Sequence, residues 1–319
     1  MKPVIEARNL NKSFREGSLA LSGLDLTVAC GSVYGLIGRN GAGKTTAMRC
    51  LMGLLRPDSG TARILGADFW TAPRQRRQQV GYVSQSQRLP GWMSLRDFCR
   101  YVSQFYERWD EGLAEHLTSL WDVPRTRPIS ELSWGEQRMV SILTTMASRP
   151  RVLLLDEPAA GLDPIARRSL LSNLIELMNH DARCTILLSS HLIQDLERVA
   201  DTIGIMDRGR IIRSVCLQEL LETTKRVQVV FDRDEPPPGF SIPGAQRSET
   251  AGPVVTAIVN LANDQQLDPV RRLPGTRVQI FPLGLEEIFI QLQGSQTKGT
   301  WPDEKIKAPP LQEPVSWKN

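Results

Sequence analysis

The sequence predicts an α/β fold in which helices cover a parallel sheet, and three observations lead to this prediction. Between residues 4 and about 213, short β-branched or apolar runs alternate with helical stretches. One run leads into a glycine-rich loop and then a helix, and another run ends in two adjacent carboxylates. Open α/β sheets bind ligands at the carboxyl ends of their strands, so both loops are candidates for one site.

The bulk composition is typical of a globular protein without a membrane span. The chain has 319 residues, of which 41% are hydrophobic and 23% charged, and its net charge of +4 is too small to argue for a nucleic-acid partner. No run approaches the roughly 18 apolar residues of a spanning helix, and the first ten residues lack the apolar core of a signal peptide, so we expect a cytosolic chain. Five widely spaced cysteines predict neither a disulfide framework nor a zinc site.

The first part of the chain reads as a nucleotide-binding domain over residues 1–222. Its clearest strand candidates, in chain order, are residues 33–37, 152–155, 185–188 and 202–206. Strand signals vanish between residues 89 and 139, which predicts a helical insertion, and Ser94 with Asp97 resembles the N-cap of a helix there.

The remaining residues predict a small accessory domain over residues 223–293 and then a tail. The expected elements are a helix at 217–225, strands at 226–231, 254–260 and 276–281, and an amphipathic helix at 284–293. From residue 294 to residue 319 the sequence is polar, proline-bearing and aperiodic, which predicts a flexible tail.

The segment GRNGAGKTT, residues 38–46, matches the phosphate-binding pattern G-x-x-x-x-G-K-[ST]. In this pattern backbone N–H groups surround a phosphate, Lys44 reaches the outer phosphates, and Thr45 offers its hydroxyl to Mg²⁺. The strand before the loop and the helix after it make an ordinary glycine turn a poor alternative. The expected nucleotide-binding residues are Gly38, Arg39, Asn40, Gly41, Ala42, Gly43, Lys44, Thr45 and Thr46.

The segment RVLLLDEP, residues 151–158, supplies a second half of the site. A buried strand delivers Asp156 and Glu157 side by side at its carboxyl end. Asp156 can hold the Mg²⁺ shell through water, and Glu157 can orient and deprotonate an attacking water. An acidic pair after an apolar run is a weak signal alone, but with the phosphate loop it favours nucleotide hydrolysis.

Together with further motifs, in the same order along the chain, these segments resemble an ATP-binding cassette (ABC) ATPase, the motor subunit of ABC transporters. Phe14 falls where the family stacks an aromatic ring on adenine, and Gln85 in GYVSQ matches the glutamine that senses Mg²⁺ and the γ-phosphate. The segment LSWGEQR, residues 132–138, corresponds to the family signature. Asp163 in AGLDP matches the loop that crosses to a partner, and His191 in SSH matches the switch histidine.

The resemblance implies that the signature of one subunit caps the γ-phosphate held by another, so that two cassettes close around two ATP molecules. Ser133 and Gly135 keep the usual pattern Leu-Ser-Gly-Gly-Gln, whereas Trp134 and Glu136 depart from it. A tryptophan still has its backbone N–H, so we interpret the site as working, although a positive φ at this position would strain it. Glu136 either weakens triphosphate capture or faces a sugar hydroxyl.

We therefore expect an ATP- and Mg²⁺-dependent ATPase that works as a dimer beneath a separately encoded transmembrane permease, at the cytoplasmic face of the membrane. Residues 284–293 resemble the closing helix of exporter subunits, which favours export. The expected docking surface is the helical insertion with Leu89, Trp92 and Met93. The alternatives are a soluble ABC ATPase that acts on a macromolecular complex, and an inactive regulatory cassette, which the intact motifs disfavour.

Overall fold

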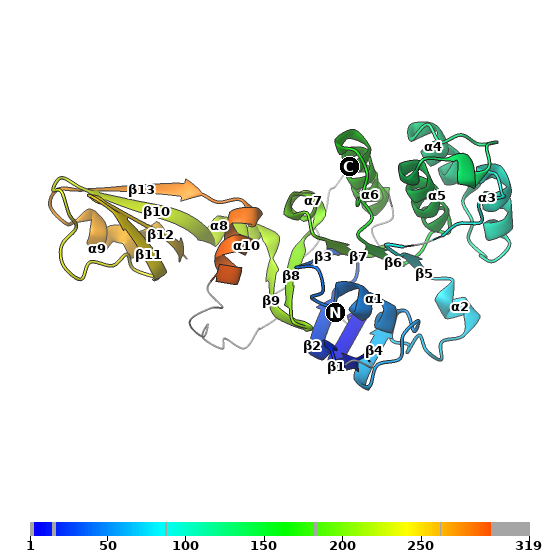
Figure 1. Cartoon of the computed structure of the whole chain (residues 1–319), viewed down its shortest axis with the longest axis horizontal. Coiled ribbons are helices and arrows are strands. Elements are labelled where there is room, and N and C mark those ends of the chain that lie inside the picture. The colour runs from blue at the N-terminus through cyan, green and yellow to red at the C-terminus, as the bar shows by residue number, and fades with distance from the viewer. Residues whose placement is uncertain (1–2, 15–16, 87, 181–183, 262, 295–319) are drawn as a thin grey trace, which may run out of the picture. The chain divides into compact units, whose positions relative to one another are not determined.

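The computed structural model describes residues 3–14, 17–86, 88–180, 184–261 and 263–294. These residues form two compact units that divide between Ser214 and Val215 (Figure 1). Within the described ranges no helix is long and apolar enough to cross a membrane. The predicted tail lies outside the described residues from residue 295 onward, and the division into domains at residues 222 and 223 stays a prediction.

A six-stranded sheet forms the centre of the first unit, and its strands β5, β6, β7, β3 and β8 pair in parallel in this order. The predicted α/β class is therefore confirmed. β3 leads into the phosphate loop and lies between β7 and β8. β6 carries the acidic pair and lies on the other side of β7, so one strand separates it from β3. The strands are β3 (Val33–Gly38), β5 (Val80–Val83), β6 (Val152–Asp156), β7 (Thr185–Ser190), β8 (Thr202–Asp207) and β9 (Arg210–Cys216).

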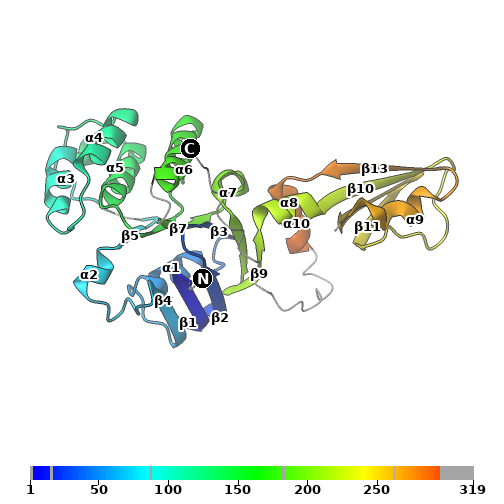
Figure 2. The same ribbon diagram turned by 180° about the vertical axis from the view of Figure 1, so that it is seen from behind.

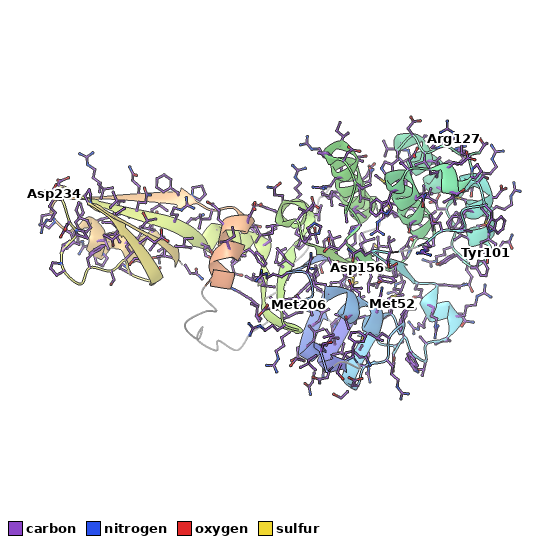
Figure 3. All side chains as sticks on the ribbon, in the orientation of Figure 1. Met52, Tyr101, Arg127, Asp156, Met206 and Asp234 are labelled. Atoms are coloured by element: carbon purple, nitrogen blue, oxygen red, sulfur yellow. The ribbon has the colours of Figure 1, made fainter. Side chains whose placement is uncertain are left out.

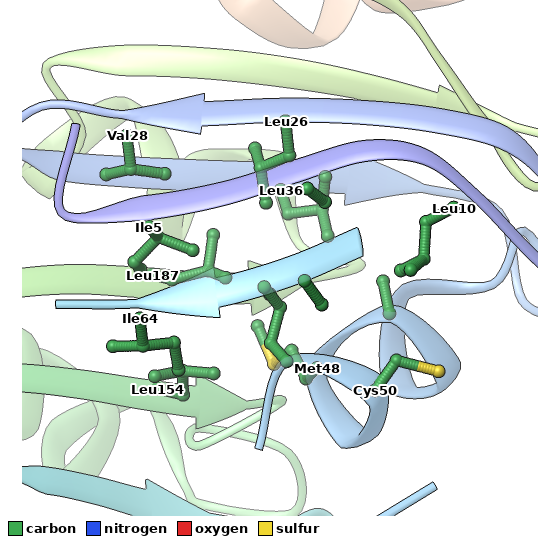
Figure 4. Close-up of a cluster of buried hydrophobic side chains, with 14 of the residues drawn as sticks. Ile5, Leu10, Leu26, Val28, Leu36, Met48, Cys50, Ile64, Leu154 and Leu187 are labelled. Atoms are coloured by element: carbon green, nitrogen blue, oxygen red, sulfur yellow. The ribbon is translucent and has the colours of Figure 1, made fainter. Parts of the chain in front are cut away.

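A second sheet, antiparallel and three-stranded, packs against the first and was not anticipated from the sequence. Its order is β2-β1-β4. The side chains of Ile5 and Leu26 face Leu154 and Leu187 of the parallel sheet, with Met48 in the same buried cluster (Figure 4). The strands are β1 (Ile5–Ser13), β2 (Leu19–Val28) and β4 (Ser59–Ile64).

Helices lie on both faces of the parallel sheet (Figures 1 and 2). α1 shares its face with the antiparallel sheet, and α6 and α7 lie on the opposite face. The glycine at position 35 permits this, because a Cβ there would meet Leu196 and Ala200 at α7. The helices are α1 (Lys44–Leu51), α6 (Pro164–His180) and α7 (Ile193–Val199).

Helices occupy the stretch between β5 and β6, and the last of them continues beyond residue 139, the end of the predicted insertion. Ser94 caps α3 as expected, since its hydroxyl accepts a hydrogen bond from the Asp97 N–H at 3.2 Å. The last helix continues to Ala147 because apolar positions continue to that point. The helices of this region are α3 (Leu95–Ser103), α4 (Glu111–Leu120), η1 (Ile129–Glu131) and α5 (Trp134–Ala147), and the short helix α2 (Arg74–Arg77) lies earlier in the chain, before β5.

The second unit is built on a four-stranded antiparallel sheet of order β11-β12-β10-β13. Alternate residues of β10 and β12, including Val227, Val229, Val255 and Val259, enter one apolar core. The strands are β10 (Thr224–Phe231), β11 (Ala245–Ala251), β12 (Val254–Asn260) and β13 (Thr276–Pro282). The helices are α8 (Leu217–Thr223), η2 (Asp264–Leu267), α9 (Asp268–Arg271) and α10 (Leu285–Gly294).

Two expectations for this unit need correction. The helix expected to reach Lys225 ends at Thr223, because Thr224 and Lys225 pair with Asn260 and Val259 of β12. β11, with the sequence AQRSETA, was missed because this polar edge strand lacks apolar alternation.

Candidate functional site

The phosphate loop sits in backbone surroundings that accept only glycine at two of its positions. Gly43 has φ of +106°, a left-handed conformation, and an added Cβ would overlap the carbonyl oxygen of Ala20 in β2. A Cβ on Gly38 would lie 2.5 Å from the carbonyl oxygen of Met206 in β8. The loop is thereby held against two strands at the carboxyl end of β3.

Lys44 begins α1, and its residue is only 6% exposed. Its Nζ donates to the carbonyl oxygen of Gly38 at 2.7 Å and lies 3.6 Å from Oε1 of Glu157. An ammonium buried this far needs an anion or acceptors around it, and here it has both. The cation is thus placed at the loop that would hold phosphates.

Asp156 ends β6 in the interior of the first unit (Figure 3) and is completely buried. Its Oδ1 accepts a hydrogen bond from the Ser189 hydroxyl at 2.8 Å. Among the described residues its Oδ2 has no hydrogen-bond partner, although the atom is buried. A buried carboxylate oxygen without a donor fits a cation or the water shell of one.

Glu157 follows in a strained backbone conformation, with φ of +51°. Its N–H donates to the Ser189 hydroxyl at 3.0 Å, and its residue is 5% exposed. Its Oε2 lies 2.6 Å from Nδ1 of His191 and accepts the His191 N–H at 3.2 Å. The structure therefore brings Lys44, Glu157 and His191 together from the ends of three different strands, with Glu157 between the other two.

The signature segment forms the start of α5, with Ser133 as its N-cap. The Ser133 hydroxyl accepts the Glu136 N–H at 3.2 Å, and the Ser133 N–H donates to Oε2 of Glu136 at 2.7 Å. These hydrogen bonds form a capping box and hold the pKa of the Glu136 carboxyl below its usual range. Glu136 is thus committed to the helix start, a role that neither sequence interpretation of this residue included.

Trp134 is the first residue of α5 and has no positive φ, so the strain considered from the sequence does not arise. Its indole lies over Gly161, where an added Cβ would approach the ring to 2.5 Å. Gly135 faces the same loop, since its Cβ would lie 3.4 Å from Leu162. The start of the signature helix therefore packs on the loop that precedes Asp163.

The other predicted residues occupy separate positions. Oδ1 of Asp163 accepts the N–H groups of Ile165 and Ala166 at 2.8 and 3.0 Å, which caps α6 and lowers the pKa of the Asp163 carboxyl. Phe14 is 47% exposed in the turn after β1, and Gln85 is exposed after β5. In the part of the chain that the structure describes, neither residue forms a hydrogen bond to the phosphate loop.

Sequence reasoning missed Arg138, which joins the signature helix to the acidic pair. This buried guanidinium donates to the carbonyl oxygens of Asp156 at 2.8 Å, Glu157 at 3.0 Å and Pro158 at 3.1 Å, and also to that of Ser84. Burial lowers the pKa of the Arg138 guanidinium. An arginine directly before the apolar run MVSILTTMA was the available signal.

A phosphate loop after the central strand of a parallel sheet, opposite a buried acidic pair, defines a nucleotide-binding protein of the P-loop class. A family model described as ABC transporter matches residues 21–160. The Nod factor export ATP-binding protein I of Cupriavidus metallidurans (strain ATCC 43123 / DSM 2839 / NBRC 102507 / CH34) is 30% identical over 93% of this chain and all of its own. This chain belongs to the family of ABC transporter ATP-binding subunits.

Two further comparisons agree with this family. The ABC transporter ATP-binding protein YtrB of Bacillus subtilis (strain 168) is 28% identical over 92% of this chain and all of its own. A solved structure of an ATP-binding subunit of an ABC transporter is 27% identical, has a TM-score of 0.61, and is matched over 69% of this chain and 92% of its own. The protein is accordingly an ATPase that binds ATP and couples its hydrolysis to transport.

Proposed function

We propose that this chain powers export through a separately encoded permease. The observation that supports export is the likeness to the Nod factor export subunit, which extends over 93% of this chain and so includes the second unit as well as the cassette. A likeness to the cassette alone would be compatible with any direction of transport.

In the proposed mechanism Glu157 is the general base for the attacking water. ATP phosphates attract the Lys44 ammonium, which now lies 3.6 Å from Oε1 of Glu157, and thereby free this oxygen to accept a proton from water. His191 holds the other carboxylate oxygen at 2.6 Å and so fixes the direction of the base. Nucleotide binding thus fills the site and also draws Lys44 away from the Glu157 carboxylate, which can then act as the base.

We assign Mg²⁺ to the site on the basis of Asp156. Its buried Oδ2, which has no partner among the described residues, fits the ion or its water shell, and the half-buried Thr45 and the exposed Gln85 complete the proposed set. The ion would neutralise charge on the transferring phosphate. Asp156 itself stays oriented by the Ser189 hydroxyl.

The second half of each site comes, in this proposal, from another copy or a related subunit. The start of α5 presents the Ser133 hydroxyl, N–H groups and the positive end of the helix dipole to the partner's γ-phosphate. Asp163 lies at the start of α6, on the loop under Trp134, and would reach across the same interface.

The permease is proposed to dock on the helical insertion. Trp92 is 78% exposed just before α3, and Leu89 and Met93 are half-buried beside it. Tyr101 lies in the last turn of α3 (Figure 3), and Phe105 follows just after this helix. Both are about half exposed, with their rings 5.1 Å apart. A group of exposed aromatic side chains such as these three is typical of a protein interface. Docking of the permease here would place the ATPase at the cytoplasmic face of the membrane.

Replacing Glu157 by glutamine tests the site. The variant should bind ATP with unchanged affinity and lose hydrolysis, because the phosphate contacts persist and the base is gone. With ATP it should accumulate as a dimer in size-exclusion chromatography. Turnover within about tenfold of the wild type, with contaminating ATPases excluded, would show that Glu157 is not the base.

A further inference from the structure

Outside the proposed catalytic set, two side chains of opposite charge, one buried and one half-buried, each have a buried polar atom without a hydrogen-bond partner among the described residues. Asp195, on α7, is 5% exposed, and its Oδ2 has no hydrogen-bond partner among the described residues. Arg167, in the first turn of α6, has a buried Nε that is likewise unpartnered in the described part of the chain. Nothing in the proposed reaction uses either residue.

Each of the two side chains is attached to a different loop of the site. The side chain of Ser190 interacts with the Asp195 carboxylate and lowers its pKa, and Ser190 immediately precedes His191. The Ser190 hydroxyl in turn accepts the Leu192 N–H at 3.0 Å, so Asp195 is tied to the backbone on both sides of the switch histidine. A shift of the carboxylate would move that loop.

Arg167 has the corresponding connection to the loop that ends in Asp163. The Nη2 of its guanidinium donates to the carbonyl oxygen of Leu162 at 3.4 Å, and its backbone N–H donates to the carbonyl oxygen of Asp163 at 2.9 Å. Leu162 also faces Gly135 of the signature helix. The guanidinium is therefore tied to the loop that is proposed to meet the second cassette.

The two groups affect one another electrostatically across the contact between α6 and α7. Burial raises the pKa of the Asp195 carboxyl, and the positive charge of Arg167 opposes this rise. No ion pair within 4.0 Å joins them in this structure, and a displacement of the Asp163 loop that brought them together would convert two unmatched buried atoms into one charge-assisted hydrogen bond.

We propose that Asp195 and Arg167 are positioning residues that couple the Asp163 loop to the switch histidine. When a second cassette displaces the Asp163 loop, Arg167 moves onto the carboxylate, and Asp195 sets His191 through Ser190. His191 then fixes Glu157 for proton abstraction. This inference rests on the proposed roles of His191, Asp163 and Glu157, and it adds the link by which dimer closure controls the base.

The experiment uses the full chain and separates rate from binding. Asp195→Asn removes the charge but keeps a carbonyl oxygen that can accept from Ser190, and Arg167→Met removes the cation at similar length. Each should lower kcat about tenfold or more while KM and the Kd of a fluorescent ATP analogue stay within about twofold. The exposed neighbours offer matched controls, since Gln194→Ala and Arg168→Met should stay within about twofold of the wild type.

A double variant and a conservative variant distinguish coupling from damage. Asp195→Asn with Arg167→Met should be no more than about twofold slower than the slower single variant, because both changes remove one interaction. Asp195→Glu should restore kcat to within about threefold of the wild type, since the carboxylate is retained. Losses that multiply, or a loss of ATP affinity equal to the loss of rate, would overturn the proposal.

Folding and the proposed function are checked separately. If thermal unfolding shows that Asp195→Asn does not fold, Arg167→Met and Asp195→Glu decide the question alone. If Glu157→Gln is inactive while Asp195→Asn and Arg167→Met both keep wild-type turnover, only the coupling is wrong. If Glu157→Gln hydrolyses ATP normally, the proposed role of the base fails, and the coupling proposal fails with it.

Discussion

Glu157 shows how a single residue combines strain with function. Its left-handed backbone costs about 1–3 kcal/mol for a non-glycine residue, so it persists only where several contacts hold it. Here Ser189 accepts its N–H, and His191 and Lys44 approach its carboxylate. In this backbone conformation the Glu157 carboxylate lies between Lys44 of the phosphate loop and the switch histidine, and we propose that the attacking water binds beside it.

Trp134→Gly tests whether the indole belongs to the chemistry. The variant should keep ATPase activity within about tenfold, because only the backbone N–H is proposed to contact phosphate. It should lose about 1–2 kcal/mol of unfolding free energy, since glycine is a poor helix former and the contact with Gly161 disappears. Steady-state ATPase rates and urea unfolding measure these effects.

The Trp134→Gly variant should be compared with the double variant that combines Ser133→Ala with Gly135→Asp. That variant should be far less active, because it removes a proposed phosphate donor and adds a negative charge at the helix start. Loss of all turnover in folded Trp134→Gly would instead make the indole a functional part of the site.

Glu136→Gln separates the charge of the capping box from its geometry. Glutamine at this position also completes a capping box, so the two proteins should be equally stable once the pH is well below the folded-state pKa of Glu136, where its carboxyl is protonated. The folded-state pKa of Glu136 is lowered, so the carboxylate stabilises the fold above its unfolded pKa of about 4.3, and this contribution is lost as the pH falls through the folded value.

The wild type should therefore exceed Glu136→Gln by about 0.3–1 kcal/mol of unfolding free energy near pH 7, and the excess should shrink as the pH falls below the unfolded pKa and through the lower folded-state pKa of Glu136. Urea unfolding at several pH values measures it. A difference that does not change with pH would mean that the carboxylate charge contributes nothing at the helix start.

At the scale of elements, α5 connects the signature to the hydrolytic site. Its first turn presents the capping box and packs on the loop before Asp163. One turn later, Arg138 donates to carbonyl oxygens of the acidic loop and of the segment after β5. Movement of this helix would therefore be transmitted directly to the backbone that carries Asp156 and Glu157.

Arg138→Met should destabilise the first unit by about 2–4 kcal/mol, because several buried carbonyl oxygens lose their donor. Arg138→Lys keeps the charge but has a single donor group, so an intermediate loss is expected. Urea unfolding followed by tryptophan fluorescence measures both. Equal midpoints for Arg138→Met and the wild type would show that water satisfies these carbonyl groups without the guanidinium.

At the scale of the whole molecule, the site is proposed to be complete only when two cassettes meet. The chain alone should then be a weak ATPase, because the rate depends on how often two copies close. A permease that holds two copies together raises their effective concentration, to the mM range for a short tether. In this proposal, transport and hydrolysis are coupled through the docking surface.

Replacing Trp92 and Met93 by alanine should reduce the ATPase rate that the permease stimulates. The basal rate and the nucleotide affinity should stay unchanged, since neither side chain lies at the phosphate loop. ATPase assays with and without permease in lipid nanodiscs measure both rates. An equal loss of both rates would indicate a folding defect rather than lost docking.

Local patterns in the sequence were sufficient for the parallel strands, the phosphate loop, the acidic pair and the N-cap at Ser94. Each of these depends on residues a few positions apart, whose spacing reflects the strand, turn or helix they form. The antiparallel sheet of β1, β2 and β4 was not predicted, because β1 pairs with β4, which follows only after the parallel strand β3 and the helix α1. The polar edge strand β11 was missed because its own residues lack apolar alternation.

The sequence by itself determined the parallel strands and the loops that end them, and it predicted which residues of those loops would bind a triphosphate. Only the tertiary structure decided that Lys44 and His191 approach the same carboxylate, that Arg138 binds the acidic loop, and that Trp134 covers Gly161. These contacts join residues tens of positions apart. They form only when the packing of two sheets and their helices brings strand ends together, and no short-range pattern encodes that geometry.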